Sequence, residues 1–404
     1  MTIPSSRRAA ITGYGCLTAL GVESSSTWQS LIQGMSARVP ITAIPVQGCR
    51  VTEGAQATLP NLPHLSAKQV ARMSRASRLI HPAAREALAQ ADLLSSDGRC
   101  KFPRLETSIS TTACGMEKGE QFLHAVWNDQ RGNRAALLAH YQAQQQIGEL
   151  QRCFNFYGPT TVISNACAGG ANAIGHAADL IRSGMADIVL AGGYDALCEL
   201  VYCGFDSLLT LAPELCRPFD RGRNGLMIGE GAAFLVLESE EHALRRGATI
   251  HGIIAGYGHT TDTFHLTQPH QEGVALERAM QQALDQARLP ASDIGYINAH
   301  GTGTPINDGS EAKAFTRLFP ASTRLSSTKA AIGHTLGAAG AIEAVFSLLA
   351  LKTGSLPPQL NLLDPLPDVA AMLVEPGEQH SLRSVMSVNL GFGGSNAALI
   401  LTHA

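Results

Sequence analysis

Residues 162–171, Val-Ile-Ser-Asn-Ala-Cys-Ala-Gly-Gly-Ala, decide the fold of this 404-residue chain. The pattern predicts a strand and a sharp turn, and then an apolar-periodic helix over residues 172–183. Cys167 begins that helix, where unpaired N–H groups and the positive end of the peptide dipoles favour a thiolate. We therefore interpret Cys167 as a nucleophile. A buried structural cysteine is the alternative that this stretch leaves open.

The composition limits the class of protein. A net charge of −3 and 45% apolar residues predict a large core in two packed halves. Low charge and 5% aromatic content argue against nucleic-acid binding. Nine cysteines without metal-ligand spacing or C-x-x-C pairs indicate neither a metal site nor disulfides, and they suit a cytoplasmic location. Residues 1–8 lack a signal-peptide pattern, and no apolar run approaches the ~18 residues of a membrane span, so we expect none.

Two further strand-to-loop junctions place a histidine among glycines. His300 follows the predicted strand 293–298, and His334 follows a strand that ends near residues 326–329. A fourth junction, residues 391–396, is rich in glycine and has no titratable group. A nucleophilic cysteine and its histidine need to meet only in space, so we expect these junctions to converge. Either histidine alone beside glycine is more typical of a structural residue than of a catalytic one.

The order of elements in residues 1–248 roughly recurs in residues 249–404. A strand opens each half, and each half later offers a small-residue turn into an alanine-rich helix, at 167–183 and at 334–354. We interpret the two ranges as duplicated halves. Phosphate-binding motifs of the G-x-G-x-x-G and G-x-x-x-x-G-K-[ST] types are absent, as is a G-x-S-x-G nucleophile turn.

Residues 66–94 predict one long helix that starts at a capping Ser66 and carries a row of basic side chains. Such a row is usually a solvated helix face. The alternative is a docking patch for an acidic partner, with Lys68, Arg72 and Arg75 as the candidates.

Four motifs together resemble the elongating β-ketoacyl-[acyl-carrier-protein] synthases, from about Ala9 to Leu401. They are residues 165–170 (Asn-Ala-Cys-Ala-Gly-Gly), 299–304 (Ala-His-Gly-Thr-Gly-Thr), Lys329 with Gly333-His334, and 391–394 (Gly-Phe-Gly-Gly). The resemblance implies an α/β, thiolase-like fold. In that fold, duplicated βαβ halves form a layered α-β-α-β-α core with an inserted helical cap region.

The resemblance also implies a role for each site residue. Cys167 would accept an acyl chain from acyl carrier protein, and the N–H groups of Cys167 and Phe392 would hold the oxyanion. After malonyl-carrier loses CO2, neutral His300 and His334 would donate hydrogen bonds to the enolate. Four more roles follow: Lys329 tunes the histidines, Glu343 supports Lys329, Thr302 and Thr304 bind the phosphopantetheine arm, and Phe392 is a gate. No cofactor is implied, because the substrates arrive on the carrier.

Simpler interpretations stay open for these supporting residues. Lys329 and Glu343 suit an ordinary ion pair, the threonines suit a turn, and Phe392 suits a core aromatic.

Three alternatives concern the kind of enzyme. A degradative thiolase is less favoured, because such enzymes use a second cysteine near the C-terminus and the last one here is Cys216. The chain also resembles the active subunit of a ketosynthase/chain-length-factor heterodimer, since non-catalytic partners typically lack the cysteine. A compact segment at 194–218, with departures at 117–150, resembles accessory ketosynthases of aryl-polyene or polyketide pathways. We expect a homodimer or a heterodimer.

Overall fold

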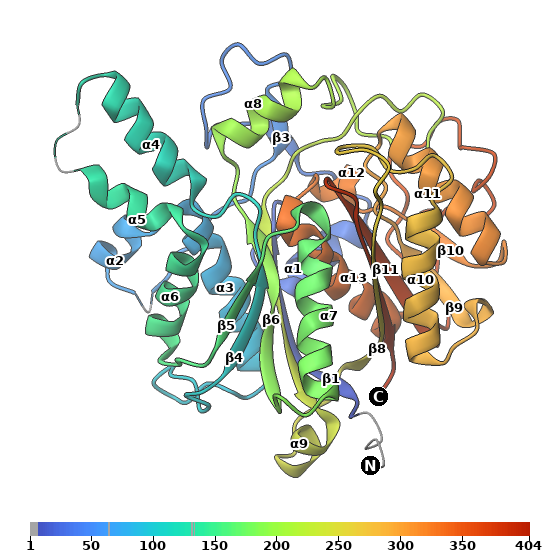
Figure 1. Ribbon diagram of the computed structural model, residues 1–404, viewed down its shortest axis with the longest axis horizontal. Helices are drawn as coiled ribbons and strands as arrows, with labels where there is room; N and C mark the ends of the chain where they lie inside the picture. Colours follow the sequence, from blue (N-terminus) through green and yellow to red (C-terminus); the bar gives the residue numbers. More distant parts are fainter. Residues whose placement is uncertain (1–6, 64, 131, 133) are drawn as a thin grey trace.

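One sheet of ten strands runs through the part of the chain that the structure describes (Figure 1). The computed structural model describes residues 7–63, 65–130, 132 and 134–404, so the expectation of no leader at residues 1–6 lies outside it. The strands are β1 (Ala9–Thr18), β4 (Glu106–Ser110), β5 (Thr160–Ile163), β6 (Ile188–Asp195), β7 (Gly231–Ser239), β8 (Gly252–Thr261), β9 (Ile294–Asn298), β10 (Arg324–Ser326), β11 (Ser384–Gly391) and β12 (Ser395–Thr402). A separate small hairpin pairs β2 (Arg38–Pro40) with β3 (Glu53–Ala55).

The strand order repeats between the two halves of the chain. From the centre outward it is β1-β7-β6-β4-β5 on one side and β8-β12-β11-β9-β10 on the other. When the five strands of each half are numbered in chain order, both halves show the same order from the centre to the edge of the sheet: first, fifth, fourth, second and third strand. A short antiparallel pairing of residues 9–11 with residues 252–254 joins the two series. The predicted duplication is thus confirmed in strand order, and we propose that residues 1–248 and 249–404 are the repeated units.

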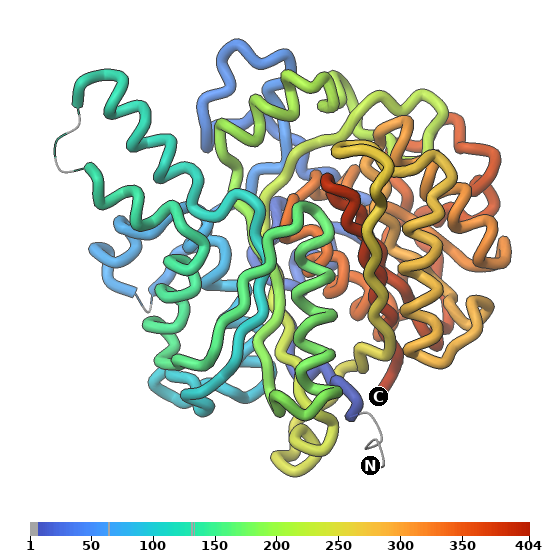
Figure 2. The backbone as a smooth tube through the Cα atoms, in the orientation of Figure 1, coloured from blue at the N-terminus to red at the C-terminus, as the bar shows by residue number. Residues whose placement is uncertain are grey.

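Helices lie on both sides of each half-sheet and between them (Figures 1 and 2). The central layer consists of α7 (Gly169–Arg182) and α13 (Ala339–Thr353). Helix α7 packs on β4 and β6, and α13 packs on β11 and β7. On the outer faces, α3 (Arg75–Gln90) covers β1 and β7, and α10 (Val274–Ala287) covers β8 and β12. This is the α-β-α-β-α layering that the resemblance implies.

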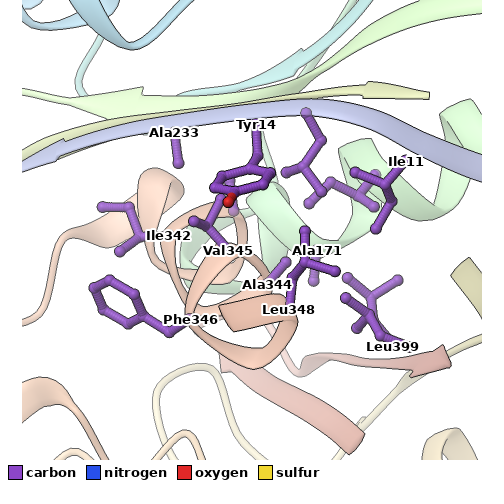
Figure 3. Close-up of a cluster of buried hydrophobic side chains, with 14 of the residues drawn as sticks. Ile11, Tyr14, Ala171, Ala233, Ile342, Ala344, Val345, Phe346, Leu348 and Leu399 are labelled. Atoms are coloured by element: carbon purple, nitrogen blue, oxygen red, sulfur yellow. The ribbon is translucent and has the colours of Figure 1, made fainter. Parts of the chain in front are cut away.

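Helix α13 is the centre of the largest hydrophobic cluster. Figure 3 shows Ile342, Val345 and Phe346 of α13 beneath Tyr14 of β1. Apart from Glu343, Ser347 and its last two residues, α13 has only apolar residues and glycine, so it suits an enclosed position. Residues 336–353 are long and apolar enough to cross a membrane, so the expectation that no run approaches this length is wrong. That segment is 89% buried, which identifies it as a core helix.

The two central helices cross where each begins. A Cβ atom on Gly170 would lie 2.6 Å from the backbone nitrogen of Ala341, and one on Gly340 would lie 2.4 Å from that of Ala171. The contacts are reciprocal, as expected for duplicated halves. Only glycine permits such a close approach, which brings the starts of both helices to one place.

A helical cap stands beside the first half, at the left of Figure 1. Its members are α2 (Ala67–Arg72), α4 (Met116–Trp127), η1 (Arg134–Ala136), α5 (Leu137–Tyr141) and α6 (Ala143–Phe154). Helix α8 (Glu199–Ser207), at the top of Figure 1, contacts α4. The remaining helices are α1 (Ser24–Ile32), η2 (Ala166–Ala168), α9 (Glu240–Arg245), η3 (Ala291–Asp293), α11 (Pro305–Leu318), α12 (Lys329–Ile332) and η4 (Leu336–Ala338).

The single helix predicted over residues 66–94 is two helices, α2 and α3. Ser66 caps α2 as predicted, in a reciprocal capping box with Gln69. Ser74 caps the second helix by accepting a hydrogen bond from the N–H of Ser77. The alanine-rich periodicity does not reveal that Ser74 is a second N-terminal capping residue. The chain changes direction at Ser74, between α2 in the helical cap and α3 on the sheet.

Candidate active site

Cys167 lies in the η2 turn that joins β5 to α7, as the strand–turn–helix pattern predicts. The preceding residue, Ala166, has a φ of 54°, in the left-handed region that a residue with a Cβ rarely adopts. Such local strain persists only when the surroundings enforce it, and it is frequent at functional sites. The cysteine is 5% exposed.

His334 follows the short helix α12, which the sequence-based prediction of a strand ending near residues 326–329 did not include, and it approaches the cysteine directly. Its Nε2 lies 3.0 Å from Cys167 Sγ. Its Nδ1 accepts a hydrogen bond from the N–H of Leu336 at 3.3 Å. An acceptor nitrogen carries no proton, so the neutral ring is protonated at Nε2 and presents that N–H to the sulfur.

His300 completes the convergence of the three predicted junctions. It follows β9, and its ring centroid is 5.3 Å from that of His334, with the rings nearly perpendicular at 86°. The backbone N–H groups of His300 and Gly301 donate to the two carboxylate oxygens of Glu311, at 2.8 and 2.7 Å. Glu311 therefore fixes the loop that presents the ring.

Lys329 and Glu343 form a buried ion pair behind the histidines. Lys329 Nζ is 2.5 Å from Glu343 Oε1, and both side chains are 1% exposed. Asn389 donates to the other oxygen of Glu343 at 2.6 Å. Burial lowers the pKa of His300 and of His334 well below the usual value, and the charge of Lys329 lowers both further. Both imidazoles are therefore neutral at physiological pH.

The cysteine itself differs from the sequence-based expectation. Burial raises the pKa of the Cys167 thiol to about 12. The charge of Lys329 and the N–H groups of Phe392 and Cys167 lower it, but by less. The expectation that the helix start alone favours a resting thiolate is wrong, because desolvation of the sulfur outweighs these contacts.

The fourth, glycine-rich junction closes over the sulfur. A Cβ atom on Gly391 would lie 3.2 Å from the backbone nitrogen of Cys167. The backbone N–H of Phe392 lowers the pKa of the Cys167 thiol. The Phe392 ring is 39% exposed and stacks on Phe205 of α8, with centroids 5.7 Å apart. It is not a core aromatic.

A cavity of about 460 Å³ leads to these groups. Cys167, both histidines and Phe392 line it, together with Thr302 and Thr304. The two threonine hydroxyls are 2.9 Å apart. The wall of the cavity that holds the sulfur and both histidines thus also offers a pair of hydroxyl groups.

The three basic docking candidates differ in availability. Lys68 and Arg72 are exposed on α2. Arg75 is not available, and its assignment to the docking patch is wrong. Its guanidinium forms an ion pair with the fully buried carboxylate of Glu230 and donates to the carbonyl oxygen of Ala57 at 2.9 Å. A helical charge pattern does not show that one member turns inward to a buried acid.

Two buried carboxylates escaped the sequence-based reasoning. Asp195 ends β6 and accepts hydrogen bonds from two separate loops, and Glu311 lies on α11. The position of Asp195 at the carboxyl end of a strand, beside the parallel strand β4, is the signal that could have found it. In the part of the chain that the structure describes, no group of three or more His, Cys, Asp or Glu could hold a metal ion.

Comparison with known proteins agrees with this geometry. Residues 6–243 match the family described as "Beta-ketoacyl synthase, N-terminal domain", and residues 251–363 match "Beta-ketoacyl synthase, C-terminal domain". Nodulation protein E of Rhizobium meliloti (strain 1021) is 36% identical, over 97% of this chain and 98% of that one. 3-Oxoacyl-[acyl-carrier-protein] synthase 2 of Staphylococcus aureus (strain N315) is 35% identical, over 98% of both.

Solved structures give the same result. The ishigamide ketosynthase/chain length factor superposes with a TM-score of 0.91 at 31% identity, covering 99% of this chain and 100% of that one. A ketosynthase in complex with its chain length factor from Xenorhabdus doucetiae has a TM-score of 0.84 at 30% identity, covering 98% of each. The thiolase-like fold implied by the sequence is thereby confirmed.

Proposed function

The chain belongs to the β-ketoacyl synthase family and is an acyltransferase, and on this premise we propose a role for each residue of the site. Cys167 Sγ attacks the thioester carbonyl of an acyl chain on acyl carrier protein. The new bond joins this sulfur to the acyl carbon, the bond to the phosphopantetheine sulfur breaks, and the thiol proton ends on the departing sulfur. The 3.0 Å approach of His334 to Cys167 is the observation that carries this proposal.

The second half of the reaction uses both imidazoles. Malonyl-carrier loses CO2 as its carbon–carbon bond breaks, and the electron pair becomes an enolate. The N–H groups of neutral His300 and His334 donate to the enolate oxygen. The carbanion then attacks the acyl carbon on Cys167, whose oxyanion accepts hydrogen bonds from the backbone N–H groups of Cys167 and Phe392. The product is 3-oxoacyl-carrier, and the thiolate of Cys167 is released.

Lys329 keeps the two histidines neutral, so each can donate a hydrogen bond to the enolate without transferring a proton to the carbanion. Its positive charge lies close enough to both rings to lower their pKa values. Glu343 balances this charge within the core. Thr302 and Thr304 hydrogen-bond the amides of the phosphopantetheine arm, and Phe392 moves against Phe205 as the acyl chain enters.

The carrier protein docks on a basic surface around α2. Lys68 and Arg72 are exposed there, and Arg72 shares a cavity of about 870 Å³ with Lys118 of α4 and Arg134 of η1. An acidic carrier is the partner that this charge attracts. The double variant Lys68→Glu/Arg72→Glu should bind the carrier more weakly, whereas the control Arg85→Glu, exposed on α3, should not. Unchanged affinity in the double variant would refute this docking surface.

A second candidate is the catalytic subunit of a heterodimer. Two of the similar solved structures contain a ketosynthase with a chain length factor. Cys167, His300 and His334 are all present here, so this chain would supply the chemistry. Strand β5, directly before the cysteine turn, is one edge of the ten-stranded sheet and is open to pairing. The compact segment 194–218 supports an accessory polyene or polyketide pathway, and the nine free cysteines support a cytoplasmic location.

Intact-mass analysis with a panel of acyl carrier proteins tests the proposal. The acyl chain that is transferred to the protein identifies the substrate class. The variant Cys167→Ser should not accept an acyl chain. The matched control is Cys203→Ser, which replaces a half-buried cysteine of α8 and should load normally. Acyl loading that persists in Cys167→Ser would refute the assignment of Cys167 as the nucleophile. Light scattering of the chain alone and with a co-expressed ketosynthase-like partner distinguishes a homodimer from a heterodimer.

A further inference from the structure

The carboxylate of Asp195 joins the two halves of the chain through hydrogen bonds. It is fully buried and accepts hydrogen bonds from the Thr111 hydroxyl at 2.7 Å and from the Ala113 N–H at 2.8 Å. The N–H of Thr112 lies 3.0 Å from both of its oxygens. These three donors follow β4 in the first half. The fourth donor, the N–H of Gly337 at 2.6 Å, belongs to η4 in the second half.

The η4 turn is the element that orients His334. The N–H of Leu336 donates to His334 Nδ1, while the N–H of the next residue, Gly337, donates to Asp195. Leu336 has a φ of 53°, a left-handed conformation that costs a leucine free energy and needs outside support. The fit is close, because a Cβ atom on Gly337 would lie 2.9 Å from Asp195 Oδ2.

We propose that Asp195 is a positioning residue for condensation. It clamps the 336–338 turn so that the Leu336 N–H holds His334 in the tautomer that presents Nε2–H to the substrate. This inference rests on the proposed role of His334 as a donor to the enolate. It assigns a task to a carboxylate that hydrogen-bonds neither the sulfur nor either imidazole, but only Thr111, Thr112, Ala113 and Gly337.

The charge of Asp195 has a second effect, on the sulfur. Burial raises the pKa of Asp195 to about 6, so the group is mostly ionised at neutral pH. Its charge opposes a thiolate at Cys167, whereas Lys329 on α12 favours one. His300 and His334 face the same sulfur but are neutral. Loss of the Asp195 charge should therefore lower the Cys167 pKa.

Two variants separate position from charge. Asp195→Asn removes the charge and replaces one acceptor oxygen with an NH2 group. Gly337→Ala pushes the turn away from the carboxylate and keeps the charge. Asp220→Asn is the matched control. Asp220 is also buried and accepts from the N–H groups of Gly222, Leu363 and Asp364.

Both test variants should load acyl chains but decarboxylate malonyl-carrier roughly 10- to 100-fold more slowly, as when a carboxylate that orients a functional imidazole is lost. The pH dependence of Cys167 alkylation by iodoacetamide needs no carrier. Its midpoint should move to lower pH in Asp195→Asn but not in Gly337→Ala or Asp220→Asn.

Wild-type decarboxylation by either folded test variant would overturn the inference, as would an equal loss in Asp220→Asn. If Asp195→Asn does not fold, Gly337→Ala alone tests whether the position of the 336–338 turn controls decarboxylation. Failure of the proposed function is recognised separately, because wild-type protein would then not load at Cys167.

Discussion

Removing Lys329 and Glu343 together distinguishes a functional charge from an ordinary ion pair. Lys329→Ala alone leaves the Glu343 carboxylate buried without its partner. The 2.5 Å pair is 1% exposed on both sides. Breaking such a pair costs about 3–5 kcal/mol of unfolding free energy. This loss would confuse any measurement of activity in the single variant.

The double variant Lys329→Met/Glu343→Gln removes both charges and keeps similar volumes. Exchanging a whole buried ion pair is often close to neutral, so its unfolding free energy should lie within about 2 kcal/mol of wild type. The amide oxygen of the introduced glutamine can still accept from Asn389, which donates to Glu343 in the native protein. Urea denaturation gives the free energies, and the two single variants show the cost of an unpaired charge.

Activity should not recover with stability. Lys329 lowers the pKa of both histidines, so their pKa values rise in the double variant. A neutral imidazole only donates a hydrogen bond to the enolate, whereas an imidazolium would transfer a proton and quench the carbanion. The acid-side loss of condensation should therefore move to higher pH. A double variant with the wild-type rate and the wild-type pH profile would show that Lys329 is only half of an ion pair.

Three other predictions follow from the site. His300→Ala and His334→Ala should each load acyl chains but decarboxylate malonyl-carrier roughly 10²-fold more slowly, because each loses a hydrogen-bond donor worth about 3 kcal/mol. Mass spectrometry of the carrier would detect the acetyl product, and wild-type rates would contradict the donor assignment. Arg75→Ala should lose about 3–5 kcal/mol of unfolding free energy, because the buried carboxylate of Glu230 is left without its partner. Lys68→Ala should change the unfolding free energy by less than about 0.5 kcal/mol. Equal urea midpoints for the two variants would contradict the buried ion pair. The imidazole NMR signals of His300 and His334 should not titrate between about pH 6 and 8, since both pKa values lie well below the ordinary ~6.5. A midpoint near ~6.5 in either signal would contradict their neutrality, whereas the rate alone would also respond to Asp195, whose pKa is about 6.

The parts of the site that the sequence predicts are those written into short local patterns. Cys167 and His300 each follow a strand end among small residues, His334 follows the short helix α12 among small residues, and the structure brings all three together. The duplication is predictable for the same reason, because each half repeats a strand and a small-residue turn into an alanine-rich helix.

The parts that the sequence does not predict depend on burial and on contacts between distant segments. Arg75 belongs to a helical row of basic residues, yet its partner Glu230 lies 155 positions away. The raised pKa of the Cys167 thiol depends on how completely the surrounding chain excludes water. Asp195 gains its importance from Gly337, which lies 142 positions further on. A local pattern contains none of this information.

The reciprocal crossing of α7 and α13 has a consequence for how negative charge is accommodated. The second copy of the turn carries Gly337 in the place where the first carries Cys167, so the chain has two such turns but a single sulfur between them. The electropositive beginnings of both helices adjoin the same small volume. An anion formed there is stabilised by both repeats at once, and a polypeptide containing either repeat alone would lack half of that field.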